Sequence, residues 1–553
     1  MIFCYFSIMK IMTKSEIKNL LHQQLVEIAS KLNIKRQVVL IQPKDHGDFT
    51  TNMAMGNKEL GNPIDLANSI VELLQPHLSR LNIAKIEVAG PGFINFLLAE
   101  SSIVSGINQI IELGENYGRG QKRGNINIEW VSANPTGFMH VGHARNAAIG
   151  STIANICEFS GLSVTREYYI NDAGNQINVL AQSVFARYQQ KFDQNFPMPE
   201  ECYRGDDIIW ASEQIYNESG DKFINSSLNG EVLEYFKNRS TELFMSAVKK
   251  DLSRFNVYFD RFFSEKTLYN EDSKAIKDTV AKLKNTYVKD SALWLQTTLD
   301  GDDKDRVLIK SDGTYTYFLP DIAYHDHKFH SNGDNPTILN IWGADHSGYI
   351  KRMESAMKNI GNNPDKLVVL CMQLVRLIKN GEEFKMSKRR GTSFWLREFI
   401  DLVGSDSARF ILLDRTTNTK LDFDIDLATA KTNDNPAFLV QYANARALAL
   451  LEKAGATKKT LIASDYSSTP DLKLSSLLME FPQIIDKSVD KLATNILTQY
   501  IIKVAKEFNS WYSNTDKIIE RSDQENALAL VKATSTVLQN GLRLLGISIP
   551  QKI

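Results

Sequence analysis

The chain has 553 residues, a formal net charge of -1 and an ordinary globular composition, with 43% hydrophobic and 23% charged residues. This length is too great for one compact core and predicts two to four domains. The balanced charge excludes a protein that coats nucleic acid through bulk positive charge, although it leaves room for a local basic surface.

The cysteines and the first twelve residues indicate the cellular location of the protein. The four cysteines form no Cys-x-x-Cys pair; they are Cys4, Cys157, Cys202 and Cys371. This scatter argues against structural zinc and a disulfide framework, and it fits a reducing cytoplasm. Residues 1–12 are apolar, lack a basic region and a cleavage site, and are too short to span a bilayer. We expect a non-structural leader there; a weak membrane-surface anchor is the alternative.

Residues 13–117 predict a separate N-terminal α+β domain. Apolar residues recur with helical spacing over residues 17–28 and 64–74. Gly90-Pro91-Gly92, followed by alternating Phe and Ile, predicts a hairpin. A glycine-rich basic linker follows at residues 114–124. The pattern leaves two roles open for the domain, a structural appendage or a module that contacts RNA.

Strand and helix patterns alternate through residues 118–425. The expected segments are a strand at 126–131, a helix at 144–159, a strand at 164–170, a helix at 177–188, and strands at 338–343 and 367–370. This rhythm predicts a doubly wound, Rossmann-like parallel sheet with right-handed crossovers. A mainly helical stretch at about 191–290 interrupts it, and we expect a helical insertion there.

Residues 426–553 carry long helical patterns without a clear strand. The expected helices cover 437–451, 472–478, 485–508 and 527–545. This predicts a C-terminal all-α bundle. The fold class is therefore multidomain α/β, in which a parallel-sheet catalytic domain lies between the N-terminal α+β domain and the bundle.

A compact motif lies where the first strand of the sheet meets its helix. The turn Asn134-Pro135-Thr136-Gly137 precedes His140-Val141-Gly142-His143, and a helix rich in small residues follows. A helix N-terminus behind a strand presents amides and a positive dipole end to phosphate. The histidines can donate hydrogen bonds to a triphosphate, and Gly142 leaves the backbone open to a flat base. Two surface histidines near a helix start are the alternative reading.

A second motif, Lys385-Met386-Ser387-Lys388-Arg389, follows about 240 residues later. Two lysines and an arginine on one loop can wrap a polyphosphate and stabilise the charge of the departing pyrophosphate. A basic loop on its own is usually solvated surface. Together with the histidine motif it indicates nucleotide chemistry at phosphorus.

The two motifs resemble the His-Ile-Gly-His and Lys-Met-Ser-Lys-Ser signatures of class I aminoacyl-tRNA synthetases. From about residue 13 to the C-terminus the chain resembles arginyl-tRNA synthetases of the bacterial type. The matching segments are Ser132–Gly137, Tyr168–Gln176, Thr314–Tyr324, Asn435–Pro436, Val440–Arg446 and Gly546–Pro550. The chain departs from the family pattern at Phe138, usually a proline, at Lys388-Arg389, usually Lys-Ser, and in its last three residues.

The resemblance implies ATP-dependent activation of L-arginine to arginyl-adenylate, then transfer to the 3′-terminal adenosine of tRNA(Arg) in translation. Positioning and electrostatics must supply the rate, because no covalent enzyme intermediate is needed. The implied catalytic residues are His140, His143, Lys385 and Lys388. The implied ATP-binding residues are Asn134, Pro135, Thr136, Gly137, His140, Gly142, His143, Gly343, Asp345, His346, Lys385, Met386, Ser387 and Lys388.

The arginine site implied by the resemblance comprises Glu129, Ser132, Asn134, Tyr317, Asp321 and Tyr324. Ser132 and Asn134 would hold the α-amino end, while Glu129, Tyr317 and Asp321 would read the guanidinium. Carboxylates suit this planar, permanently charged group. If the later stretch is helical, its two tyrosines and Asp321 share one face; a tyrosine packing stripe is the alternative. Gly343–His346 either contacts the ribose or is an ordinary polar turn.

The resemblance also implies the partners. They are tRNA(Arg), L-arginine and ATP with Mg²⁺; no protein metal site, structural zinc, DNA or membrane partner is expected, and the family is mostly monomeric. Two other functions compete. One is a different class I ligase or a nucleotidyltransferase that shares the histidine motif. The all-α C-terminal domain disfavours a small-molecule nucleotidyltransferase, which would have no use for an anticodon-reading bundle. A synthetase-like RNA-binding protein without catalysis is disfavoured by the intact histidines and lysines of the two motifs.

Overall fold

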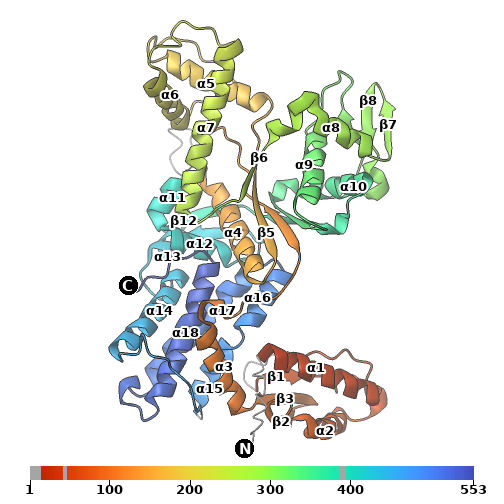
Figure 1. Cartoon of the computed structure of the whole chain (residues 1–553), viewed down its shortest axis with the longest axis vertical. Coiled ribbons are helices and arrows are strands. Elements are labelled where there is room, and N and C mark those ends of the chain that lie inside the picture. The colour runs from red at the N-terminus through yellow and green to blue at the C-terminus, as the bar shows by residue number, and fades with distance from the viewer. Residues whose placement is uncertain (1–13, 42–46, 385–393, 467) are drawn as a thin grey trace, which may run out of the picture.

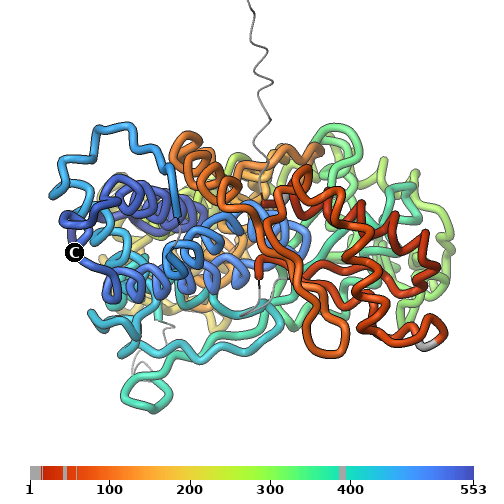
Figure 2. The backbone as a smooth tube through the Cα atoms, turned by 90° about the horizontal axis from the view of Figure 1, so that it is seen from below, coloured from red at the N-terminus to blue at the C-terminus, as the bar shows by residue number. Residues whose placement is uncertain are grey.

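The computed structural model describes residues 14–41, 47–384, 394–466 and 468–553. The expected leader at residues 1–12 lies outside this part of the chain. A parallel sheet forms the centre of the molecule, with two lobes above it in Figure 1 and the helical bundle below it. The N-terminal domain lies beside the bundle, as Figure 2 also shows from below. Within the described residues, no helix is both long and apolar enough to cross a membrane.

The N-terminal domain is a three-stranded antiparallel sheet covered by two helices. Its strands, in the order β1-β3-β2, are β1 (Phe49–Thr51), β2 (Ile83–Ala89) and β3 (Phe93–Leu98). Its helices are α1 (Lys14–Lys31) and α2 (Pro63–Leu74). Asn62 caps α2 by accepting from the Ile64 N–H, and Pro63 fills the first helical position. The β2–β3 pair is the hairpin predicted around the Gly-Pro-Gly turn.

Helix α3 (Glu100–Leu113) departs from the expected division. The sequence pattern grouped it with the N-terminal domain, but it packs against α15 (Thr469–Leu478) and α18 (Gln524–Leu544) of the bundle. The Asn108 side chain exchanges two hydrogen bonds with the backbone of Ala463, at 3.0 and 2.7 Å. The apolar face of α3 is thus covered by helices far away in the sequence, which periodicity alone cannot reveal.

The catalytic domain is built on a five-stranded parallel sheet, which confirms the predicted fold class. In spatial order the strands are β11 (Leu367–Met372), β10 (Thr337–Gly343), β4 (Asn125–Glu129), β5 (Ser163–Ile170) and β6 (Arg261–Ser264). Leu339 and Ile341 of β10 join the core that contains helix α4 (Ala144–Phe159), while Ile338 joins the core of α9 (Phe318–Ser331) and α10 (Ile350–Ile360). The sheet is therefore buried on both faces, as parallel sheets are.

Two lobes replace the single insertion expected at about 191–290. The first lobe is helical and contains α5 (Asn175–Gln189), α6 (Asp206–Ser219) and α7 (Gly230–Arg254). Strand β6 then returns to the main sheet beside β5, inside the range expected to be inserted. The second lobe adds α8 (Asn270–Lys282) and an antiparallel sheet of β7 (Thr286–Lys289), β8 (Ala292–Leu295) and β9 (Arg306–Ile309). The sequence pattern missed β6 because this edge strand has four residues, all only half-buried.

A small connecting region leads from the sheet to the bundle. It contains β12 (Val375–Lys379), β13 (Glu382–Glu383), β14 (Leu421–Asp424), α11 (Leu396–Val403), α12 (Ser405–Leu413) and α13 (Ile425–Thr429). The bundle adds to α15 and α18 the helices α14 (Pro436–Lys453), α16 (Phe481–Asp490) and α17 (Asn495–Asn514). The helix expected at 485–508 is thus two helices, and Leu492 between them has a positive φ of 47°.

Candidate active site

The first motif begins at the end of β4, where the backbone makes a strained turn. Val131 and Ser132 have positive φ values of 67° and 42°, a region that a β-branched valine rarely adopts. Such conformations cost about 1–3 kcal/mol each and persist only where the surroundings enforce them. Here Asn146 accepts from the Val131 N–H at 2.9 Å, and the Ser132 hydroxyl donates to Glu129 Oε1 at 2.9 Å. The turn brings Glu129 and Ser132 to the wall of one cavity.

The two histidines of the motif lie together at the start of α4. Their ring centroids are 3.9 Å apart, and His140 Nδ1 accepts a hydrogen bond from the Gly142 N–H at 3.1 Å. This bond leaves the proton of neutral His140 on Nε2. Burial lowers the pKa of both rings, and with the neighbouring His140 it lowers the pKa of His143 to about 4. Both rings are therefore neutral donors near pH 7 rather than cations.

Two glycines around the motif are required by close packing. A Cβ at Gly142 would lie 2.7 Å from the His140 ring, and a Cβ at Gly150 would lie 2.2 Å from Trp130 Cγ. Helix α4 is buried along almost its whole length, so small residues let it press against the end of β4. This contact fixes the histidine motif to the sheet.

Phe138, where the family usually has proline, joins three parts of the domain. Its ring lies 5.0 Å from Trp210 of α6 and 5.1 Å from Trp395, and the Arg397 guanidinium lies 3.6 Å from its centroid. Its N–H donates to Asp207 at 3.3 Å, a bond that a proline could not form. The phenylalanine thus connects the motif to the helical lobe and to the start of α11.

The second motif, including Lys385, Met386, Ser387 and Lys388, lies outside the described residues. The residues on either side of it reach the first motif. Phe384 and Phe394 are in ring contact at 6.0 Å, and Phe394 O accepts from the Val141 N–H at 2.8 Å. The Leu396 N–H in turn donates to Met139 O at 2.7 Å. The chain therefore enters and leaves the second motif beside the histidines.

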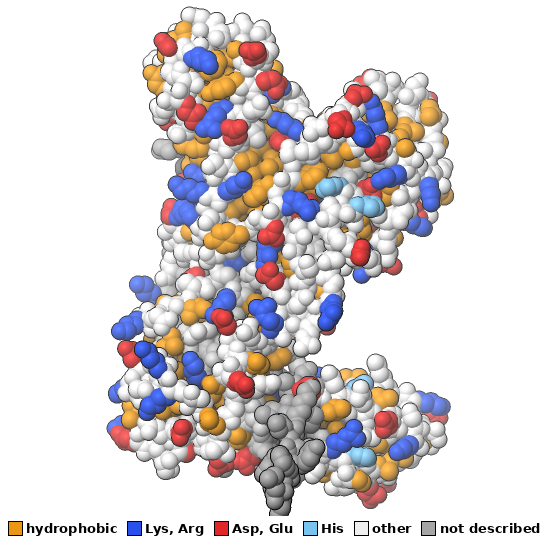
Figure 3. All heavy atoms as spheres, in the orientation of Figure 1, with side chains coloured by type: hydrophobic (Ala, Val, Ile, Leu, Met, Phe, Trp, Pro, Cys, Tyr) orange, Lys and Arg blue, Asp and Glu red, His pale blue; other side chains and the backbone are white. Residues whose placement is uncertain are grey.

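A cavity of about 510 Å³ opens at the carboxyl edge of the parallel sheet. Its lining comes from the ends of the sheet strands and from α9, and Figure 3 shows the molecular surface hollowed between the two lobes. Seven predicted site residues line it: Glu129, Ser132, Tyr317, Asp321, Tyr324, Gly343 and His346. Ligands of doubly wound folds bind at such an edge. The arrangement therefore gathers most of the expected arginine site together with part of the expected ATP site.

The remaining predicted residues of the described chain lie outside this cavity. They are Asn134, Pro135, Thr136, Gly137, His140, Gly142, His143 and Asp345. Asn134 is exposed, and its side chain donates to Gln176 at 2.8 Å. Asp345 is 80% exposed.

The two tyrosines of the predicted arginine site, one before α9 and one within it, differ in exposure. Tyr317 precedes the helix and is 79% exposed at the cavity mouth. Tyr324 is buried, and its hydroxyl donates to Glu167 Oε1 at 2.8 Å. Tyr324 therefore offers its ring, not its hydroxyl, to the cavity, which favours the packing interpretation for this residue.

Two carboxylates besides Glu129 line the cavity, and sequence reasoning missed one of them. Burial raises the pKa of Asp321, but hydrogen bonds from His325 and Tyr349 and the positive charge of nearby Lys328 lower it below its ordinary value. Glu265 is buried in the opposite wall, and burial raises its pKa. Its only signal in the sequence is its place directly after β6, the strand that the pattern did not reveal.

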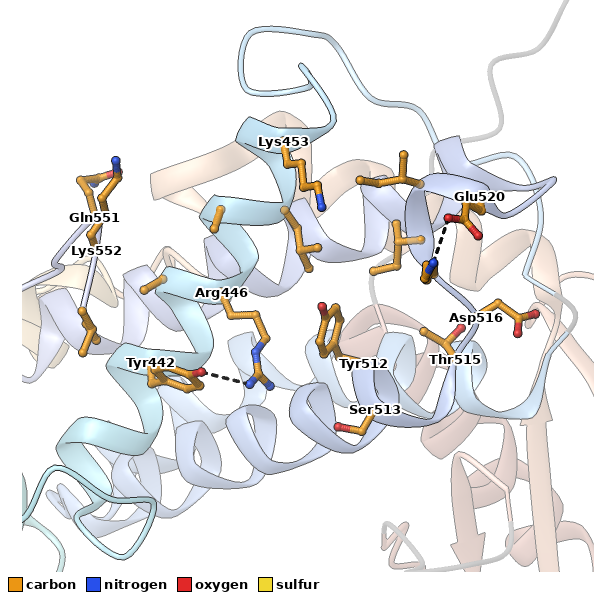
Figure 4. Close-up of a pocket in the computed structure, with 17 residues that line it drawn as sticks. Tyr442, Arg446, Lys453, Tyr512, Ser513, Thr515, Asp516, Glu520, Gln551 and Lys552 are labelled. Atoms are coloured by element: carbon orange, nitrogen blue, oxygen red, sulfur yellow. Dashed lines mark hydrogen bonds and ion pairs between the residues drawn. The ribbon is translucent and has the colours of Figure 1, made fainter.

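A second cavity, of about 1240 Å³, lies in the bundle between α14 and α17 (Figure 4). The Arg446 guanidinium lies 4.8 Å from the Tyr442 ring and 5.0 Å from the Tyr512 ring. Asn509 accepts from Arg446 at 2.7 Å and fixes the guanidinium between the two rings. The last three residues, which depart from the family pattern, also line this cavity.

Known families match the chain along nearly all its length. Residues 107–427 match the catalytic domain of class I (R) tRNA synthetases, residues 15–98 the arginyl tRNA synthetase N terminal domain, and residues 440–553 the DALR anticodon binding domain. Curated arginine–tRNA ligases are similar throughout. That of Metamycoplasma arthritidis is 45% identical over 97% of this chain and 99% of its own. That of Bacillus licheniformis is 39% identical over 97% and 99%.

Solved structures share the fold. The arginyl-tRNA synthetase of Thermus thermophilus superimposes with a TM-score of 0.72 at 18% identity, covering 97% of this chain and 100% of its own. The enzyme of Plasmodium falciparum gives 0.72 at 17% identity, covering 97% and 99%. The sheet, the histidine motif and the catalytic-domain match define a class I aminoacyl-tRNA synthetase, and so an aminoacyl-tRNA-forming ligase. The chain belongs to the arginyl-tRNA synthetase family, which confirms the resemblance drawn from its sequence.

Proposed function

We propose that this arginine–tRNA ligase binds L-arginine in the cavity at the carboxyl edge of the sheet. The main support for this proposal is that three carboxylates from different elements line one cavity, namely those of Glu129, Asp321 and Glu265. A guanidinium presents five donors in a plane and always carries charge, so it needs this kind of wall. Lysine lacks the fork, and neutral citrulline would leave buried carboxylate charge unpaired.

We propose that ATP lies between this cavity and the histidine motif. His140 Nε2 and the amides at the start of α4 would donate to its phosphates, and the adenine would lie over the backbone of Gly142, as the resemblance implies. Gly343 and His346 at the end of β10 would approach the ribose. Lys385 and Lys388 would neutralise the departing pyrophosphate, since Phe384 and Phe394 hold the ends of their segment beside Val141.

We propose that Mg²⁺ arrives on the phosphates of ATP. Magnesium is usually held through one or two carboxylates plus substrate phosphates. In the part of the chain that the structure describes, no group of three or more His, Cys, Asp or Glu side chains is arranged to hold a metal ion. The positive charge that assists pyrophosphate release would then come from the ion on the substrate and from the lysines.

We propose that the bundle cavity contacts bases of tRNA(Arg). A guanidinium held between two tyrosine rings in a cavity of this size provides stacking surfaces for unstacked bases. The atypical ending Gln551-Lys552-Ile553 would touch the same bases. We further propose that the protein acts as a monomer in the cytoplasm, which suits the free thiols of Cys157, Cys202 and Cys371.

Pyrophosphate exchange tests this function. The purified protein is incubated with ATP, labelled pyrophosphate and each of the twenty amino acids, with and without tRNA. Exchange that depends on arginine is expected, and family membership leads us to expect that tRNA is also required. Absence of arginine-dependent exchange under both conditions would contradict the proposal.

A further inference from the structure

A buried polar chain joins the carboxylates on two sides of the arginine cavity. The Lys328 ammonium is fully buried; it donates to Glu129 Oε2 at 2.6 Å and to Asn340 Oδ1 at 2.7 Å. The Asn340 amide nitrogen lies 2.7 Å from His325 Nε2. His325 Nδ1 lies 3.0 Å from Asp321 Oδ1. Residues of β4, α9 and β10 thus form one continuous chain of hydrogen bonds.

These hydrogen bonds can have only one order of donors and acceptors. An ammonium has only donors, so Asn340 must turn its oxygen toward Lys328 and its NH₂ group toward His325. His325 Nε2 must therefore accept and carries no proton. His325 Nδ1 faces two acceptors, Asp321 Oδ1 and the Asp321 carbonyl oxygen at 2.9 Å, and therefore holds the proton. Both contacts require neutral His325 with its proton on Nδ1.

This direction distributes charge unequally around the cavity. Lys328 neutralises Glu129, whose second oxygen accepts from the Ser132 hydroxyl at 2.9 Å. Neutral His325 adds a hydrogen bond but no positive charge at Asp321. Among the described residues, no lysine or arginine forms an ion pair with Asp321.

We propose that Lys328 is a positioning residue that determines arginine specificity. Its ammonium orients Glu129 and forms a pair with it that has no net charge. Through Asn340 it also keeps His325 neutral, so that Asp321 carries the negative charge of this wall without a cationic partner. The proposal rests on the proposed function of the cavity. It assigns the main counter-charge of the guanidinium to Asp321 and leaves Glu129 to orient the substrate, rather than treating the two carboxylates as equal.

Kinetics of the Lys328→Met variant test the proposal. Without the ammonium, Glu129 keeps a buried uncompensated charge, and Asn340 and His325 are free to exchange donors and acceptors. We expect the KM for arginine in tRNA-dependent exchange to rise about 100-fold while the KM for ATP stays within about twofold. The matched control is Lys282→Met, which removes a 2.8 Å pair between the end of α8 and Asp326 of α9, outside the cavity lining, and should change neither constant. Equal rises in both constants, or a fall in kcat alone, would overturn it.

A double-mutant cycle separates charge pairing from simple packing. Glu129→Gln combined with Lys328→Met removes both charges together. We expect the double variant to regain at least about tenfold of the arginine KM lost in Lys328→Met alone. Losses that simply add would show that the two residues act independently and would contradict the proposal.

Nuclear magnetic resonance gives a readout that does not depend on folding of the variants. In the wild-type protein with ¹⁵N-labelled histidine, His325 is assigned by comparison with His325→Gln. The expected pattern at neutral pH is one protonated nitrogen, Nδ1, and one unprotonated nitrogen, Nε2. Protonation at Nε2 would contradict the proposed direction of the hydrogen bonds. If the wild-type protein showed no arginine-dependent exchange, the proposed function would fail, but this spectrum would still decide the direction of these hydrogen bonds.

Discussion

Burial determines the charge of individual residues in this molecule. The histidines of the first motif are held as neutral donors, because burial lowers the pKa of both rings, which lie 3.9 Å apart. Lys328 is fully buried yet satisfied, because Glu129 and Asn340 accept from it. On the proposed function, the positive charge on the phosphates would come from Lys385, Lys388 and the Mg²⁺ that arrives with ATP, because the histidines are neutral.

Replacement of His143 by glutamine should make unfolding less sensitive to acid. The pKa of His143 falls from an ordinary 6.5 to about 4 on folding, so between these values the unfolded chain binds a proton that the folded chain does not. The wild-type protein therefore has this full contribution to stability above pH 6.5 and loses about 2 kcal/mol of it by pH 5. Glutamine does not titrate. Thermal unfolding at pH 7.5 and pH 5 should show a smaller drop in Tm for His143→Gln, and equal drops would contradict the assignment.

At the scale of elements, contact between α4 and the end of β4 holds the histidine motif against the sheet. Trp130 is buried against the glycine face of α4, and Phe259 packs on its other side at 4.3 Å between ring centroids. Protein interiors are close-packed, so added volume at this contact must move either the helix or the indole.

Gly150→Ala tests this contact. The added methyl group would lie 2.2 Å from Trp130 Cγ, and overpacking of this kind typically costs about 1–3 kcal/mol. We expect a lower Tm and a lower exchange rate, because the helix carries His140 and His143. The control is Gly348→Ala, where an added Cβ meets no atom within 4 Å. If Gly150→Ala had the Tm of the wild-type protein, α4 would not pack tightly against Trp130.

Elements with strong periodicity could be predicted from the sequence. Short strands without a clear pattern, and contacts between segments far apart in the sequence, could not. The expected helix at 144–159 coincides with α4, because its small apolar residues are bounded by clear turn signals. Strand β6 is short and half-buried and carries no such pattern. The partners of α3 are set by tertiary packing more than three hundred residues away in the sequence.

The same division holds for the site. Residues within quoted motifs, such as Ser132 and Asp321, could be predicted and do line the cavity. Glu265 and Lys328 could not, because charged residues outside a motif are usually solvated and only the structure shows that these two are buried. The positions of the second motif remain a prediction.

At the scale of the whole molecule, two buried polar joints connect the domains. Asp48 in the N-terminal domain pairs with Lys14 at 2.9 Å, accepts from the Leu98 N–H at 2.9 Å and accepts from the Ser476 hydroxyl of α15. Buried Arg409 donates to Leu545 O and Phe255 O, both at 2.8 Å, which links the end of the bundle to the catalytic domain. These joints hold the expected tRNA-contacting domains in fixed positions relative to the site.

Asp48→Ala should loosen the first joint. It leaves the Lys14 ammonium buried without a counter-ion and removes the bond to Ser476, and breaking a buried pair in this way typically costs about 3–5 kcal/mol. Hydrogen exchange should accelerate in α1 and β3 and stay unchanged in α4. Glu59→Ala, which breaks the exposed pair with Lys35, is the control and should have no effect. Unchanged exchange in α1 would show that Asp48 does not hold the domain.

The most direct test of the arginine cavity is charging of tRNA(Arg) by Asp321→Ala beside the wild-type protein. The carboxylate is the least compensated charge of its wall, so its loss should raise the KM for arginine about 100-fold and leave the KM for ATP within about twofold. That outcome would place the guanidinium at Asp321. Equal losses for both substrates, or no loss for arginine, would contradict the account.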